Sequence, residues 1–172
     1  EDDTPIGDYK ETFNNFYECS TLDTGYVVKD AEVLVVDDNE MNLSVTEGLL
    51  KKTGMNITTC RSGKEMLEIA RNHTFDVILL DHMMPEMDGI EALHRMRSDD
   101  KTLCKAVPVI AMTANAIKGA REQYISEGFD DYFSKPVSYT ELLNTIKKYL
   151  PDCKIGKADD IGEKVYVTQW LL

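Results

Sequence analysis

The chain has 172 residues, of which 42% are apolar and 29% charged, a balance typical of one folded domain with some spare length. Its formal net charge of −12 disfavours direct binding to DNA or to anionic membrane surfaces, because both carry negative charge themselves. No apolar run is long enough to cross a bilayer, and the scattered cysteines and histidines form neither a zinc motif nor a disulfide pattern, which indicates a reducing compartment.

The first 30 residues differ in composition from the rest of the chain. They contain eight acidic residues and two lysines, a charge of −6 and therefore half of the net charge. Their apolar residues show only weak periodicity, and a proline and two glycines interrupt any long element. We interpret residues 1–30 as an acidic linker or the end of an upstream module, followed by a domain at 31–151 and a C-terminal tail at 152–172.

From residue 31 onward, short runs rich in β-branched residues alternate with amphipathic segments of helical period. Asn39 and Ser138 are placed to cap two of the helices, and Gly54, Gly128 and Pro151 are placed to end three of them. In chain order, the expected elements are strand 33–38, helix 39–54, strand 56–60, helix 62–73, strand 75–81, helix 89–98, strand 107–114, helix 115–128, a short strand within 130–136 and helix 138–150.

The apolar pattern predicts both the fold and the core. The strands have apolar residues on both faces, as a parallel sheet covered by helices on both sides requires. Five strand–helix repeats imply right-handed crossovers and an α/β, doubly wound, five-stranded parallel sheet. In the helix over 39–54, the residues Met41, Val45, Leu49 and Leu50 recur near helical spacing. The predicted core consists of Val33, Leu34, Val35, Val36, Val77, Ile78, Leu79, Leu80, Val109 and Ile110 from the strands and Leu49, Leu67 and Ile146 from the helices.

Polar side chains stand where four of the five strands end. Asp37 and Asp38 end the first strand, Asp81 the third, Thr113 the fourth and Lys135 the fifth. In open α/β sheets the ligand site lies at the carboxyl ends of the strands, so we expect these side chains to converge. One aspartate at a strand end is most often a turn residue or a helix cap, but the joint pattern of three carboxylates, a hydroxyl and an ammonium is improbable by chance.

This combination of groups suits phosphoryl transfer. Clustered carboxylates raise one another's pKa, and a divalent cation removes that cost. Mg²⁺ fits a shallow site with one or two carboxylates and several waters. An ionised Asp81 beside Mg²⁺ and Lys135 is a usable nucleophile toward a phosphoryl group, and the Thr113 hydroxyl can hydrogen-bond one of its oxygens. The expected product is an acyl phosphate on Asp81.

Four motifs at these strand ends resemble those of the receiver domains of two-component response regulators. They are VLVVDDNEMN at 33–42, DVILLDHMMPEMDG at 76–89, PVIAMTAN at 108–115 and DDYFSKP at 130–136. The resemblance covers about residues 32–150. It implies a flavodoxin-like (βα)5 fold that is phosphorylated by a phosphohistidine donor and switches conformation in response.

The resemblance implies a role for each residue at the strand ends. Asp81 is the implied phosphoacceptor, Lys135 the active-site lysine and Thr113 the switch hydroxyl. Tyr132, three residues before the lysine, occupies the aromatic switch position. The implied ligands of Mg²⁺, for which Mn²⁺ could substitute, are the carboxylates of Asp37, Asp38 and Asp81 and the backbone carbonyl of Met83.

The resemblance also implies partners: a histidine kinase or a histidine phosphotransfer domain, and a homodimer formed through the face of the last helix, the last strand and the helix before it. The runs NEMN and MTANAI are more similar to receivers of hybrid sensor histidine kinases than to those of transcription factors. The 22 residues after Leu150 are too few for a helix-turn-helix output domain and carry no basic patch. We expect a fragment of a hybrid kinase that lies in the cytoplasm, is not itself inserted in a membrane and binds no nucleic acid, even if the parent protein is membrane-anchored.

Other readings remain open at this point. A stand-alone, single-domain response regulator fits the same motifs, and such a receiver would itself have at most slow autophosphatase activity. A phosphatase of the haloacid dehalogenase type needs a second aspartate two residues after the nucleophile, where this chain has Met83. A flavin-binding protein needs a loop rich in Gly, Ser or Thr after the first strand, where this chain has DDNEMN. A scaffold that never binds phosphate would not require the acids, Thr113 and Lys135 together.

Overall fold

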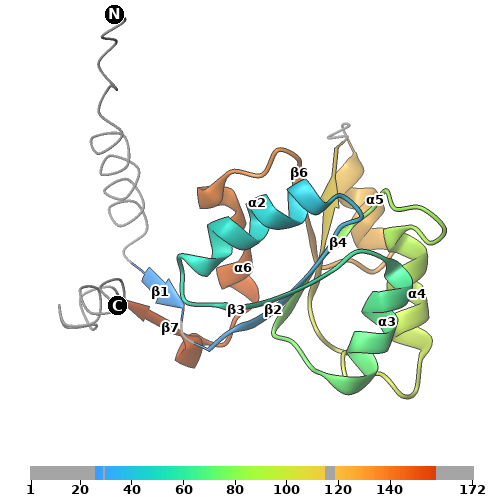
Figure 1. The fold of residues 1–172 in the computed structure, drawn as a ribbon, viewed down its shortest axis with the longest axis horizontal. Coiled ribbons are helices and arrows are strands. Elements are labelled where there is room, and N and C mark those ends of the chain that lie inside the picture. Colours follow the sequence, from blue (N-terminus) through green and yellow to red (C-terminus); the bar gives the residue numbers. More distant parts are fainter. Residues whose placement is uncertain (1–25, 29, 115–118, 158–172) are drawn as a thin grey trace, which may run out of the picture.

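Residues 26–28, 30–114 and 119–157 are described by a computed structural model of the chain (Figure 1). They form a five-stranded sheet in the order β3-β2-β4-β5-β6, and every neighbouring pair of strands is parallel. The strands are β2 (Glu32–Val36), β3 (Asn56–Cys60), β4 (Val77–Asp81), β5 (Val109–Thr113) and β6 (Asp131–Ser134).

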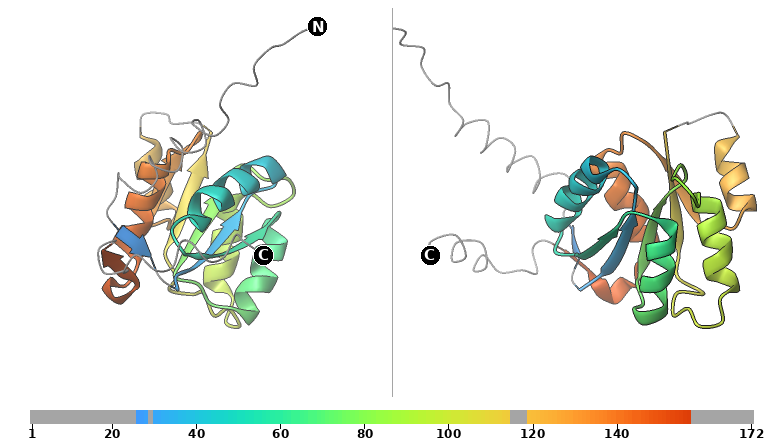
Figure 2. Two further views of the ribbon diagram at one scale, coloured as in Figure 1. Left: turned by 60° about the vertical axis from the view of Figure 1, so that its left-hand side comes forward. Right: turned by 45° about the vertical axis from the view of Figure 1, so that its right-hand side comes forward.

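Helices cover both faces of this sheet, as Figure 2 shows. On one face lie α2 (Glu40–Lys51) and α6 (Tyr139–Tyr149), and on the other lie α3 (Gly63–Asn72), α4 (Gly89–Ser98) and α5 (Ala120–Ser126). Each of these helices follows one strand in the chain, so the expected α/β, doubly wound, flavodoxin-like (βα)5 architecture is confirmed.

The core consists of two apolar layers, one on each side of the sheet. All ten predicted strand residues are fully buried, and so is Ile146 of α6. Every residue of β4 and β5 is buried, because helices cover both faces of these central strands. Two core predictions are wrong: Leu49 of α2 and Leu67 of α3 pack against the layers but are only partly buried.

The buried face of α2 also differs from the pattern read in the sequence. Met41 is 74% exposed and Val45 is 57% exposed, whereas Leu43, Thr46 and Leu50 face the sheet. Two apolar stripes compete in this helix, and the buried stripe carries two leucines separated by a polar threonine. The threonine hides that stripe from a hydropathy pattern, although its side chain fits the interface. Two large apolar side chains are therefore left in solvent next to the end of β2.

The helix ends agree closely with the signals in the sequence. The side-chain oxygens of Asn39 and Ser138 accept hydrogen bonds from backbone N–H groups of the first turns of α2 and α6. Gly128, two residues after the end of α5, adopts a φ of 102°, a conformation that favours glycine. The first residues of the helix expected over 115–128 lie outside the described part of the chain at 115–118, and α5 is described from Ala120. Among the described residues, no helix is both long and apolar enough to cross a bilayer.

Two short strands join the ends of the described chain. β1 (Tyr26–Val28) pairs antiparallel with β7 (Ile155–Lys157), which follows a 3-10 turn, η1 (Asp152–Lys154). Val28 is fully buried, and the Lys154 ammonium donates to the Asp30 carbonyl at 2.9 Å and to Oδ2 of Asp76 at 2.6 Å. Asp30 lies two residues before β2 and Asp76 directly before β4, so the pairing lies at the amino ends of the strands, away from the convergent acids.

Candidate functional site

The strand-end residues predicted from the sequence do converge. Asp37 and Asp38 follow β2 directly, and Asp81 ends the neighbouring strand β4. Carboxylate oxygens of the three aspartates lie within 4.8 Å of one another. Thr113 ends β5 and is 2% exposed, and Lys135 follows β6 directly. The parallel order of the strands is what brings these five residues to one edge of the sheet.

Lys135 is the cation of this acidic cluster. Its ammonium donates to Oδ2 of Asp37 at 2.6 Å and lies 3.0 Å from Oδ1 of Asp81. The backbone N–H of Lys135 donates to the Thr113 carbonyl at 2.7 Å, and the peptide bond to Pro136 is cis. The lysine side chain is only 20% exposed, so its charge acts on the two carboxylates with little screening by water.

Asp37 is held by donors on both of its oxygens. Besides Lys135 on Oδ2, Oδ1 accepts from the backbone N–H of Asn39 at 2.9 Å and from the side-chain amide of Asn42 at 3.2 Å. The residue is 1% exposed, so these bonds replace the water that a buried carboxylate has lost. Asp37 is thus fixed in orientation, whereas Asp38 is only partly buried at the rim of the cluster.

The electrostatics of the cluster perturb two groups. Burial raises the pKa of Asp81 above its usual range, and the charge of Asp37 adds to this rise, although the hydrogen bond and charge of Lys135 oppose it. Burial alone would lower the pKa of Lys135, but its hydrogen bonds to Asp37 and Asp81 outweigh that effect and raise it. The lysine therefore stays charged at neutral pH, and the site retains an excess of negative charge that a cation could neutralise.

The loop between β4 and α4 folds closely against the residue at its start. A Cβ atom at Gly89 would overlap the backbone carbonyl oxygen of Asp81, so only glycine allows this approach. The Gly89 N–H donates to the His82 carbonyl at 2.9 Å, which closes the loop. Met83, two residues after Asp81, has a side chain that is 68% exposed. The loop thus packs Gly89 against the backbone of Asp81 and leaves Met83 exposed to solvent.

Sequence reasoning missed three residues at this site. Asn42 lies in the first turn of α2, one turn after its bonding partner Asp37, and the amphipathic pattern gave no reason to select it. His82 and Tyr124 join β4 to α5 through a contact between the His82 Nδ1 and the Tyr124 hydroxyl at 2.7 Å. These two residues are 42 positions apart, and no spacing in the sequence indicates their contact.

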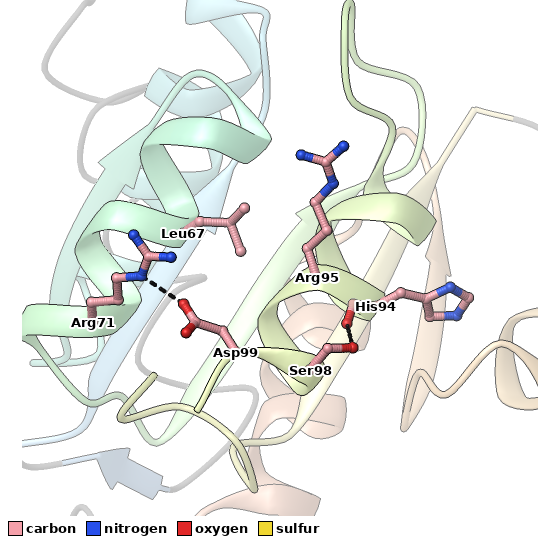
Figure 3. A pocket seen from close by; sticks show the side chains of 6 residues that line it. All are labelled: Leu67, Arg71, His94, Arg95, Ser98 and Asp99. Carbon is pink, nitrogen blue, oxygen red and sulfur yellow. Dashed lines mark hydrogen bonds and ion pairs between the residues drawn. The ribbon is translucent and has the colours of Figure 1, made fainter. Parts of the chain in front are cut away.

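A surface groove elsewhere has a different character. It lies between α3 and α4, and Figure 3 shows that the charged side chains at its lower end face one another. Arg71 Nε and Asp99 Oδ2 form an ion pair at 2.6 Å across it, and Arg95 pairs with Glu91 at 2.6 Å. Because its cations have carboxylate partners, the groove offers no group with unusual reactivity, and we place the chemistry at the acidic cluster. Its lining residues are Leu67, Arg71, His94, Arg95, Ser98 and Asp99.

Comparison with known proteins gives consistent matches. The family described as "Response regulator receiver domain" matches residues 33–147. The polar-differentiation response regulator DivK of Brucella anthropi is 39% identical over 120 residues, which cover 70% of this chain and 96% of DivK.

Solved structures show the same likeness. The receiver domain of a sensor histidine kinase from Pseudomonas aeruginosa, with a magnesium ion coordinated in its active-site cleft, is 33% identical with a TM-score of 0.63, over 70% of this chain and 97% of that domain. The receiver domain of Ssk1 from Saccharomyces cerevisiae, crystallised with the histidine phosphotransfer protein Ypd1, is 25% identical with a TM-score of 0.65, over 72% and 90%.

Proposed function

The chain belongs to the response regulator receiver family of two-component signalling, and from this premise we propose that Asp81 is its phosphoacceptor. One observation carries the proposal: the carboxylate of Asp81 lies 3.0 Å from the Lys135 ammonium and within 4.8 Å of two further carboxylates. An aspartate placed in this way can be kept ionised by cations at the carboxyl edge of the sheet, although its side chain is only 6% exposed.

We propose that the acidic cluster binds Mg²⁺ through Asp38 and Asp81, with Asp37 and the backbone carbonyl of Met83 completing the site. Three carboxylates against one lysine leave negative charge in excess, and hard oxygen donors are what Mg²⁺ prefers. Mn²⁺ prefers the same donors and is a substitute ion. When bound, the metal ion would supply positive charge next to the phosphoryl oxygens.

The protein's own residues would act as follows in the transfer step. A carboxylate oxygen of Asp81 attacks phosphorus, a new P–O bond forms, and the P–N bond of the phosphohistidine breaks with its electron pair returning to the imidazole. Lys135 offsets the charge of the phosphoryl oxygens, and the Thr113 hydroxyl donates a hydrogen bond to one of them. Thr113 and Tyr132 would then change position and shift the population of the α5, β6 and α6 face, through which the domain would also form homodimers.

We propose that the phosphoryl donor is a histidine kinase or a histidine phosphotransfer domain that docks over the outward face of α2. Met41 and Val45 are exposed on this face, and Met83 is exposed on the loop after β4. Met41 lies three residues from Asp38 in the chain and Met83 two from Asp81, so exposed apolar residues closely follow two of the acids in sequence. The receiver of Ssk1 forms a complex with a phosphotransfer protein, which supports this class of partner.

We further propose that the domain comes from a cytoplasmic hybrid sensor histidine kinase, with residues 1–30 as linker or upstream module, 31–151 as receiver and 152–172 as tail. The likeness to the receiver of a sensor histidine kinase supports this origin, and the likeness to DivK supports the stand-alone alternative. The pairing of β1 with β7 would tie both flanking segments to the receiver.

The test is incubation of the chain with phosphoramidate and Mg²⁺, followed by intact-mass measurement. We expect the gain of one phosphoryl group in the wild type, and none without Mg²⁺ or in Asp81→Asn. A folded wild type that gains no mass under these conditions would instead support a scaffold role.

A further inference from the structure

A hydrogen-bonded contact next to Asp81 has no part in the function proposed above. His82 directly follows Asp81, and its Nδ1 lies 2.7 Å from the hydroxyl of Tyr124 on α5. The backbone of His82 is fixed as well: its N–H donates to the Met112 carbonyl at 3.0 Å, and its carbonyl accepts from Gly89 at 2.9 Å. The backbone of His82 is thus hydrogen-bonded to β5 and to the start of α4.

Tyr124 is the centre of an aromatic cluster that spans from β4 to β6. It is 4% exposed and meets His82 and Phe129 edge to face, at centroid distances of 5.3 Å and 5.6 Å. Its other contact is a stacked one: the ring of Tyr132 lies 6.0 Å away with an interplanar angle of 19°. Tyr132 is three residues before Lys135 on the strand that leads to the site. The Tyr124 side chain thus contacts both His82, which follows Asp81, and Tyr132 on β6.

The hydrogen bond of Tyr124 and its ring contacts differ in how they respond to movement of their partners. Aromatic pairs are favourable in both stacked and edge-to-face arrangements over centroid distances of roughly 4.5–7 Å, whereas a hydrogen bond in a nearly buried place is directional and costly to leave unmade. A displacement of the His82 backbone therefore either pulls the Tyr124 hydroxyl along or leaves it without its partner. In both cases a displacement that starts at Asp81 alters the environment of α5, which carries Tyr124, and of the stacked Tyr132 ring.

We propose that Tyr124 is a positioning residue that couples Asp81 to α5 and Tyr132 through its hydrogen bond to His82. This inference rests on the proposed function, because it assumes that phosphorylation of Asp81 displaces the end of β4. The coupling depends on the hydroxyl group and not on the ring. Tyr124→Phe should therefore leave phosphorylation of Asp81 in place and weaken the response of α5 to it.

The test compares the wild type with Tyr124→Phe during phosphorylation by phosphoramidate and Mg²⁺. Intact mass gives the extent of phosphorylation, and hydrogen exchange of peptides covering Ala120–Ser126 gives the response of α5. Tyr149→Phe is the matched control, since its hydroxyl donates to the Asp130 carbonyl at 2.9 Å and to Oδ2 of Asp131 at 3.3 Å, and neither partner is an aromatic residue of this cluster. A thermal melt of each variant shows that it is folded.

We expect equal mass gain in all three proteins and a change in exchange of α5 that falls by at least half in Tyr124→Phe but not in Tyr149→Phe. His82→Leu should behave like Tyr124→Phe, whereas His82→Asn, which keeps an acceptor near the position of Nδ1, should retain more of the response.

Three results would overturn the inference. They are a full response of α5 in Tyr124→Phe, an absence of response in a phosphorylated wild type, and a loss of mass gain in Tyr124→Phe that places the hydroxyl in the chemistry itself. Absence of mass gain in the wild type would instead refute the proposed function, so that the two failures are distinguishable.

Discussion

Lys135 and Asp37 are 98 residues apart in the chain, and the Nζ of the one lies 2.6 Å from the Oδ2 of the other. This contact joins the strand at one side of the acidic cluster to the strand at the other. It exists only because β2, β4, β5 and β6 are parallel neighbours whose carboxyl ends share one edge.

Replacing Lys135 with alanine should uncouple phosphorylation from the conformational response while leaving Mg²⁺ binding in place. The carboxylates that bind the metal ion remain, but the variant has no ammonium group to pair with the phosphoryl oxygens. Without Mg²⁺ the variant should lose roughly 1–3 kcal/mol of stability, because Asp37 and Asp81 keep their burial and lose a donor. Calorimetric Mg²⁺ titration and hydrogen exchange of α5 check the two parts, and a normal exchange response would contradict the role of Lys135.

The raised pKa of Asp81 predicts how stability depends on pH. Between the ordinary carboxyl value and the raised folded value, the native state holds a proton that the unfolded state has released, so the free energy of unfolding falls as pH rises through this window. Asp81→Asn lacks this titration and should gain stability relative to the wild type as pH increases. Parallel urea titrations at several pH values without metal measure the difference. A wild type that gains stability over the variant with rising pH would reverse the assigned direction.

The five strands of the central sheet were predictable from the sequence, whereas β1, β7, the inward face of α2 and the individual hydrogen bonds around the acids were not. Runs such as Val77–Asp81 are apolar on both faces, and this pattern has few alternatives to a buried parallel strand. The inward face of α2 includes the buried Thr46, and a hydropathy pattern does not predict that a threonine is buried between the helix and the sheet. The bonds of Asn42 and Tyr124 depend on how distant elements pack, so they require the three-dimensional structure.

Glycine substitutions should separate the loop after Asp81 from ordinary helix positions. Gly89→Ala places a Cβ atom against the carbonyl oxygen of Asp81, so we expect a loss of roughly 1–3 kcal/mol and slower phosphorylation by phosphoramidate. Gly48→Ala is the matched control, since no atom lies within 4 Å of its added Cβ and the residue is inside α2. The control should gain about 0.5–1 kcal/mol. Chemical denaturation measures both, and equal effects would refute the close approach at Gly89.

The exposed apolar residues of α2 should matter for a protein donor and not for a small one. Met41→Ser combined with Val45→Ser should slow transfer from a phosphorylated histidine phosphotransfer domain roughly tenfold, because apolar anchors contribute strongly to docking. Phosphorylation by phosphoramidate should be unchanged. Ile125→Ser, which removes a 42% exposed apolar side chain on α5, is the control. A greater loss of transfer rate in Ile125→Ser than in the α2 variant would instead place the docking site on α5.

The most direct measurement of the central claim is the position of the phosphoryl group in the chain. Borohydride reduces an acyl phosphate on aspartate to homoserine, and peptide mass spectrometry after phosphorylation with phosphoramidate and Mg²⁺ then locates the modified residue. The account predicts homoserine at position 81 alone. Homoserine at position 37 or 38, with Asp81 unmodified, would contradict it and make Asp81 a metal ligand without an acceptor role.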